Sequence, residues 1–162
     1  GLYFFEDQYD EDTIRRNFDF YEPRTVHESS LSPCVHAILA ARLGKEDKAY
    51  EMYVRTARLD LDDYNNDTED GCHITSMAGA WLAVVKGFGG MRVFDNMLHF
   101  SPFVPKKWKG YSFHIRFRGA LVEIEAKKGS VQITNHSDHP LTIKLYGKPC
   151  LVAANASLEV SI

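Results

Sequence analysis

The sequence predicts an α+β chain in which a helical first half is followed by a small antiparallel β module. Apolar residues recur at intervals of three and four through residues 1–90, as they do on one face of an α-helix. From Met91 onward they alternate with polar residues, as in strands with one face in water. The charge changes sign at the same place, because residues 1–90 carry 17 acidic and 9 basic side chains and residues 91–162 carry 5 and 10. We therefore expect two domains, residues 1–90 and 91–162.

The first half is expected to contain three main helices, preceded by shorter helical pieces. Ser32 offers a hydroxyl cap and Pro33 suits the first helical position, so both favour a helix start at this point. Gly44 is a typical helix stop. The segment 60–71 is rich in Asp and Asn and is expected to be a loop. The expected helical segments are residues 2–9, 13–18, 31–43, 45–59 and 74–88.

The second half is expected to form short antiparallel strands. Turn residues such as Arg118-Gly119 and Lys128-Gly129 divide the alternating segments. Strands with one wet face are typical of a sandwich or a jelly-roll-like module. The alternating segments are residues 113–118, 121–126, 131–134, 141–146 and 158–162, and residues 152–155 are a candidate for one more.

Antiparallel helix pairs ahead of a β module leave two architectures open for the helices. They suit a fragment of an α-solenoid or of an α/α toroid. The sequence shows no period of 30–40 residues, which argues against a tetratricopeptide array. In the last helix Trp81 lies among small residues and is expected to be buried.

Composition excludes several classes of protein. With 44% hydrophobic and 25% charged residues the chain is typical of soluble globular proteins, and no apolar run approaches the roughly 18 residues of a membrane span. The first residues lack the basic region and cleavage site of a signal peptide. Three cysteines without Cys-x-x-Cys spacing indicate a reducing, cytoplasmic location. The acidic first half argues against a nucleic-acid face, and no histidine has a partner at metal-ligand spacing, so no metal site is expected.

Two loop-to-helix junctions carry residues suited to an anion. Ser29 and Ser30 stand just ahead of one expected helix, and Gly71 and His73 stand just ahead of another. Backbone N–H groups at a helix start, together with hydroxyls, suit a phosphate or a sulfate. A glycine lets a ligand approach the backbone, and an imidazole can donate to an anion. The alternatives are that the serines are ordinary caps and that the histidine closes a turn. His27 either orients its neighbours or is a partly buried loop histidine, and we favour the second interpretation.

These segments resemble the disaccharide phosphorylases of glycoside hydrolase family 65, which include maltose, trehalose and kojibiose phosphorylases. The resemblance covers essentially the whole chain, and in the first half it is strongest to the maltose phosphorylases. It is carried by YFFED at residues 3–7, RRNFDFYEP at 15–23, TVHESSLSP at 25–33, LDLD at 59–62, NNDT at 65–68, GCHITSMAG at 71–79 and GFGGMR at 87–92.

The resemblance implies a fold, a reaction and a site. Residues 1–90 would be the last helices of an (α/α)6 barrel, and residues 91–162 its C-terminal β module. The implied reaction is inverting phosphorolysis of maltose to glucose and β-glucose 1-phosphate, with inorganic phosphate as co-substrate and no cofactor. Ser29, Ser30, Gly71 and His73 would bind the phosphate. No catalytic residue is expected in this segment, because the general acid of the family lies upstream of Gly1.

The implied partners are the disaccharide, phosphate and the remainder of the barrel, with a homodimer as the full-length enzyme and neither nucleic acid nor membrane. We expect the isolated segment to be inactive, and to self-associate or rearrange its N-terminal helices, because an incomplete barrel leaves apolar faces uncovered. Two alternatives stand beside this interpretation. One is an inverting α-glucoside hydrolase of the same fold, in which a carboxylate replaces phosphate. The other is a non-catalytic scaffold whose β module binds carbohydrate or a partner.

Overall fold

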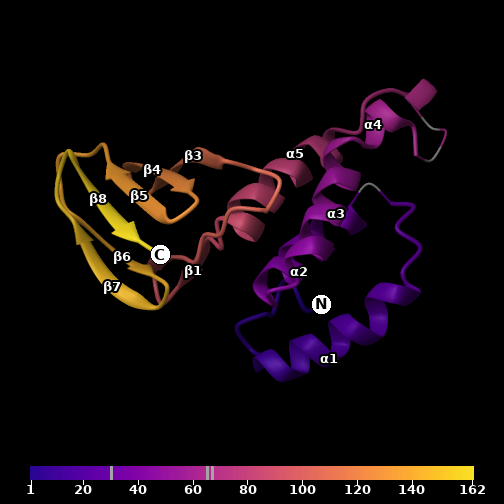
Figure 1. Ribbon diagram of the computed structural model, residues 1–162, viewed down its shortest axis with the longest axis horizontal. Helices are drawn as coiled ribbons and strands as arrows, with labels where there is room; N and C mark the ends of the chain where they lie inside the picture. Colours follow the sequence, from indigo (N-terminus) through magenta and orange to yellow (C-terminus); the bar gives the residue numbers. More distant parts are fainter. Residues whose placement is uncertain (30, 65, 67) are drawn as a thin grey trace. The chain divides into compact units, whose positions relative to one another are not determined.

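The chain forms two compact units, one helical and one built of β-strands (Figure 1). The computed structural model of residues 1–162 describes every residue except Ser30, Asn65 and Asp67, and every other side chain except that of Asp70. The first unit spans Gly1–Gly87 and the second spans Phe88–Ile162. Helices followed by mainly antiparallel sheets confirm the predicted fold class.

Most of the first unit is helical, and some of its bounds differ from the predicted ones. Residues 2–9 form turns rather than a helix. The first helix starts early because the Asp10 carboxylate accepts a hydrogen bond from the Thr13 backbone N–H at 2.7 Å, which caps it. The predicted loop 60–71 contains short helical turns. The elements are α1 (Glu11–Tyr21), η1 (Glu22–Arg24), α2 (Ser32–Arg42), α3 (Glu46–Ala57), α4 (Leu59–Asp62), η2 (Thr68–Asp70), α5 (Ile74–Leu82) and the π-helical η3 (Ala83–Phe88).

The sequence prediction is wrong for the start of α2 and confirmed for its end. Ser32 does not cap the helix: Leu31 occupies the cap position without a side-chain bond, and Ser32 is already the first helical residue. Its hydroxyl faces His27 instead, at 2.9 Å from Nδ1. The stop at Gly44 is confirmed, since this glycine has a φ of 70° and its N–H donates to the Ala41 carbonyl. Lys45 N–H donates to Ala40, which completes a Schellman motif.

Helices α2 and α5 run in the same direction, and glycines let them approach closely. A Cβ added at Gly79 would lie 2.9 Å from Cys34 Cβ, near the start of α2. A Cβ at Gly87, in η3 directly after α5, would lie 3.6 Å from Ile38 Cα and 3.7 Å from Ala41 Cβ, further along α2. Because the later glycine meets the later residues, both helices begin at the same end of the unit (Figure 1).

Trp81 is not buried within its unit, contrary to the prediction. It is 50% exposed and shares an exposed stripe of α5 with Ile74 and Met77, at spacings of three and four residues. The small residue Gly79 faces α2 and α3, so the larger side chains of α5 point the other way. Among the described residues, no helix is both long and apolar enough to cross a membrane.

The second unit contains two four-stranded sheets. Their strand orders are β1-β2-β6-β7 and β3-β4-β5-β8. In the second sheet the buried side chains alternate along β4 and β5, so that Val122 and Ile124 lie in the core while Glu123 lies on the outer face. The strands are β1 (Arg92–Phe94), β2 (Met97–Phe100), β3 (Gly110–Phe117), β4 (Ala120–Lys127), β5 (Ser130–Asn135), β6 (Leu141–Leu145), β7 (Lys148–Val152) and β8 (Ala156–Ser161).

Three features of this unit differ from the predicted antiparallel module. Strands β2 and β6 pair in parallel. Parallel pairing requires a long connection, and here the chain passes through the other sheet between the two strands. The short strands β1 and β2 were not predicted. The candidate strand at 152–155 lies instead at 148–152, because the turn falls on Tyr146 and Gly147, whose φ values of 49° and 76° suit a tight hairpin. Pro149 is tolerated since β7 is an edge strand.

Candidate functional site

The two junctions singled out in the sequence lie at one end of the helical unit. Ser29 is three residues ahead of α2, and His73 is the residue directly before α5. Since α2 and α5 run parallel, their N-termini point the same way. The structure therefore places Ser29 and His73 at the same end of two adjacent helices. Ser30 lies outside the described residues.

The carboxylate of Asp60 holds His73 at the start of α5. Asp60 Oδ1 lies 2.6 Å from His73 Nδ1, and Asp60 Oδ2 accepts the His73 backbone N–H at 2.9 Å. These two bonds fix both the ring and the backbone at the helix start. The His73 side chain is 23% exposed, and that of Asp60 is 20% exposed. Because His73 Nδ1 faces Asp60, a ligand that binds to this ring would contact Nε2.

Asp60 is a site residue that the sequence did not reveal. It stood among several carboxylates of the segment 60–71, which was expected to be a loop, and it is thirteen positions from His73 in the chain. The side-chain hydrogen bond to His73, followed by the backbone one, lowers the pKa of Asp60 below its usual value. The carboxylate is therefore ionised at neutral pH, which suits it to orient an imidazole.

Gly71 supplies a backbone conformation that other residues rarely adopt. Its φ is 110°, and its N–H donates to the Thr68 carbonyl at 3.1 Å. A Cβ added to it would meet nothing within 4 Å. The glycine is thus required by the turn that precedes His73, and the space beside it is open.

Ser29 is exposed and takes part in the turn ahead of α2. Its Oγ accepts the Leu31 N–H at 3.2 Å, and its carbonyl accepts the Ser32 N–H at 3.3 Å. The hydroxyl therefore satisfies one backbone donor near the helix start, as the capping alternative predicts. The hydroxyl proton of Ser29 is not used by this bond, so the residue keeps a donor for a ligand.

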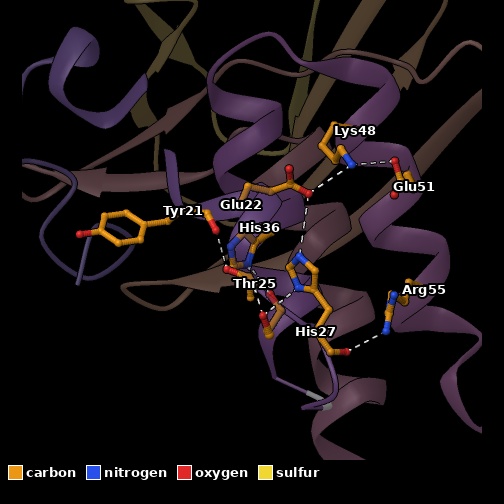
Figure 2. Close-up of polar contacts among 9 residues, drawn as sticks. Tyr21, Glu22, Thr25, His27, His36, Lys48, Glu51 and Arg55 are labelled. Atoms are coloured by element: carbon orange, nitrogen blue, oxygen red, sulfur yellow. Dashed lines mark hydrogen bonds and ion pairs between the residues drawn. The ribbon is translucent and has the colours of Figure 1, made fainter. Parts of the chain in front are cut away.

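A buried histidine holds the loop that carries Ser29 (Figure 2). His27 is 7% exposed and has a φ of 59°, which is uncommon for a residue with a side chain. Its Nδ1 lies 2.9 Å from Ser32 Oγ, and its carbonyl accepts a hydrogen bond from Arg55 of α3 at 3.0 Å. The ring packs edge-on against His36, with 4.5 Å between centroids. The loop is thus tied to α2 and α3 together.

The other side of the His27 ring faces a chain of charges. Its Nε2 is buried, has no hydrogen-bond partner among the residues that the structure describes, and lies 3.9 Å from Glu22 Oε1. Lys48 joins Glu22 at 3.1 Å to Glu51 at 3.0 Å (Figure 2). Burial is the main reason why the pKa of His27 is lowered; the nearby His36 and Arg55 also lower it, and Glu22 opposes them. The ring is therefore neutral at pH 7, which is why it can remain buried.

Comparison with known proteins places the chain in a family. Residues 1–82 match the glycosyl hydrolase family 65 central catalytic domain, and residues 91–152 match the glycosyl hydrolase family 65 C-terminal domain. The chain therefore belongs to glycosyl hydrolase family 65.

Individual relatives are phosphorylases that act on different sugars. The chain is 53% identical to maltose phosphorylase of Bacillus subtilis over 94% of its length, and 45% identical to α,α-trehalose phosphorylase of Thermoanaerobacter brockii over 90%. A solved chain from the human microbiome, assigned as a kojibiose phosphorylase, matches 99% of this chain and 24% of its own with a TM-score of 0.92 and 38% identity. The chain spans about a fifth of the length of the curated relatives, 20% and 19% respectively.

Proposed function

We propose that this chain is the phosphate-holding part of an inverting disaccharide phosphorylase that converts maltose and phosphate to glucose and β-glucose 1-phosphate. The observation that carries the proposal is the pair of junctions at one end of two parallel helices, with His73 held by Asp60 at one of them. The 53% identity to a maltose phosphorylase supports maltose as the sugar. The finer fold, with residues 1–90 as the last helices of an (α/α)6 barrel, belongs to the same proposal.

In the proposed reaction a phosphate oxygen attacks the anomeric carbon of the α-glucoside from the opposite face. The bond from that carbon to the glycosidic oxygen breaks, and the configuration inverts. The departing oxygen takes a proton from an acid outside residues 1–162, in the remainder of the barrel. Phosphate is itself the nucleophile, so no carboxylate base is needed to activate a water.

The residues of this chain would hold and orient the phosphate. Because Nδ1–H donates to the Asp60 carboxylate, the Nε2 of His73 would donate to a phosphate oxygen when the ring is in its imidazolium form. The hydroxyls of Ser29 and Ser30 would donate to other phosphate oxygens, and the open space at Gly71 would admit the ligand next to the backbone. Donors that are fixed before the ligand arrives position a nucleophile without further reorganisation. Asp60 and His27 would act through the residues they hold. We further propose a cytoplasmic homodimer that needs no cofactor.

The decisive experiment follows maltose turnover by the intact protein with and without inorganic phosphate, measuring glucose and glucose 1-phosphate. We expect phosphate-dependent glucose 1-phosphate, and a loss of at least about 100-fold in a Ser29→Ala/His73→Ala variant, because removing a single preorganised donor commonly costs about 10²–10³ in rate. A matched Ser157→Ala/His139→Ala variant alters exposed residues of the β unit and should retain activity.

Three results would correct the proposal. Equal release of glucose without phosphate would replace it by a hydrolase. Turnover of trehalose or kojibiose but not maltose would keep the mechanism and change the substrate. Unchanged dependence on phosphate in the double variant would remove Ser29 and His73 from the site.

A further inference from the structure

Three side chains with metal-binding atoms meet on the outer face of one sheet in the β unit. His114 Nε2 lies 3.5 Å from Glu123 Oε2, and His136 Nε2 lies 3.1 Å from the same oxygen. The ligand atoms of all three residues lie within 4.8 Å of one another. The two imidazole rings stack with their centroids 6.0 Å apart.

The sheet itself brings these residues together. His114 of β3 stands directly opposite Glu123 of β4 in the strand register. Glu123 stands opposite Thr134 of β5, and His136 lies two residues further along the chain. The His136 N–H donates to the Leu121 carbonyl at 2.9 Å, which fixes its backbone beside β4. The three side chains therefore project from a hydrogen-bonded scaffold rather than from a loose loop.

We propose that His114, Glu123 and His136 bind one divalent transition-metal ion, with Zn²⁺ as the reference ion. Two imidazoles and one carboxylate are a ligand set that suits Zn²⁺, Ni²⁺ or Co²⁺ and is poorly suited to Mg²⁺ or Ca²⁺, which prefer oxygen ligands. A fourth position would be open to water. The site is independent of the proposed phosphorylase activity.

The distances suit such an ion with little rearrangement. Ligand bonds of about 2.0–2.1 Å and tetrahedral angles place neighbouring ligand atoms about 3.3 Å apart. The two separations between nitrogen and carboxylate oxygen, 3.5 and 3.1 Å, are already close to that spacing. The two nitrogens can approach by side-chain rotation alone, since His114 is 52% and His136 is 40% exposed.

The spacing of these residues along the chain explains why the sequence did not indicate them. Histidine and carboxylate ligands are recognised in a sequence when they recur within one helix or one loop. Here each ligand comes from a different strand or its end, so only the register of the sheet joins them.

The test is a calorimetric titration of the chelator-treated intact protein with ZnCl₂ at pH 7.5. We expect the His114→Gln/His136→Gln variant to bind one equivalent fewer than the wild type, and the single His136→Gln variant to bind that equivalent at least about 100-fold more weakly, since even outer contacts of a metal site cost about 10–100-fold. A His139→Gln variant, in the adjoining turn and paired with Asp138, should keep the equivalent.

The outcome is decided by the difference between variants, so zinc bound elsewhere on the protein does not confuse it. Addition of excess Mg²⁺ should leave the equivalent in place. Equal Zn²⁺ stoichiometry and affinity in the wild type and in the double variant would overturn the proposal. Thermal melting of each variant without metal verifies that the substitutions leave the protein folded.

Discussion

The two junctions ahead of α2 and α5 use histidine in opposite ways. His27 is buried, bonded on its Nδ1 side to Ser32, and held among groups from η1, α2 and α3. His73 is partly exposed, and the carboxylate of Asp60 bonds both its ring and its backbone. The first ring stabilises a loop from within, whereas the second is presented at the surface of its unit. A histidine beside a helix start is therefore a candidate ligand only when its environment leaves it accessible.

The largest effect is expected from separating His73 from its carboxylate. An Asp60→Ala substitution in the intact protein should lower kcat/KM for phosphorolysis by about 10–100-fold, because a small misplacement of a positioned group can cost about 10²-fold. The KM for phosphate should rise while the KM for maltose stays nearly constant, which a general loss of structure would not produce.

Asp62→Ala is the matched control for that experiment. Asp62 is a neighbouring carboxylate whose partner, Arg58, is exposed, and surface ion pairs contribute only about 0–1 kcal/mol. It should leave both KM values unchanged. If Asp60→Ala and Asp62→Ala behave alike, Asp60 does not position His73 for a ligand.

An intermediate effect on stability and on phosphate affinity is expected at Gly79, where α5 packs closely against α2. In Gly79→Ala the new Cβ would lie 2.9 Å from Cys34 Cβ, so α5 has to move away from α2. Overpacking of this kind costs about 1–3 kcal/mol in the free energy of unfolding. Urea unfolding measures it, and the affinity for phosphate should fall in the same variant.

Gly87→Ala provides the control, since its Cβ would make only ordinary contacts, 3.6 Å from Ile38 Cα. It should be neutral or slightly stabilising, because alanine loses less backbone entropy than glycine on folding. Equal stability of the two alanine variants would show that α2 and α5 are not packed at Gly79 as described.

The smallest effect is expected from pH, and it distinguishes His27 from Asp60. The pKa of His27 is lowered on folding, so the unfolded chain takes up a proton that the folded chain does not. Its contribution to stability is complete above pH of about 6.5 and is lost as the pH falls from there toward the folded pKa. The pKa of Asp60 is also lowered, and its contribution is complete above about 3.9 and is lost in more acid solution.

Urea unfolding at pH 7.5 and 5.5 measures the His27 contribution. The wild type should lose more stability between these two pH values than His27→Asn, in which asparagine can adopt the same positive φ. An equal loss in both proteins would mean that His27 is not the group responsible.

The class of each half could be predicted from sequence because local periodicity determines it. The period of three to four before residue 88 and the period of two after residue 110 reflect which side chains face a core. Gly44 ended its helix as predicted because only the backbone conformation of that residue is involved. The resemblance to glycosyl hydrolase family 65 was also confirmed from sequence alone.

Other features depended on side-chain contacts that no short pattern encodes, and these were predicted wrongly or missed. Ser32 was expected to cap α2, but its hydroxyl lies against Nδ1 of the buried His27 instead. Trp81 was expected in the core, but the packing of Gly79 against α2 turned it outward. The strands β2 and β6 can pair in parallel because β3, β4 and β5 of the other sheet lie between them in the chain.

The sequence by itself thus determined the change from helices to strands, the two junctions and the family, since each of these depends on short segments of the chain. Tertiary structure alone decided that Asp60 reaches His73, that His27 ties its loop to α2 and α3, and that His114, Glu123 and His136 meet on one sheet. The physical reason is that a hydrogen bond or a metal ligand requires atoms about 2–3 Å apart. That proximity is set by helix packing and strand register, which no local pattern encodes.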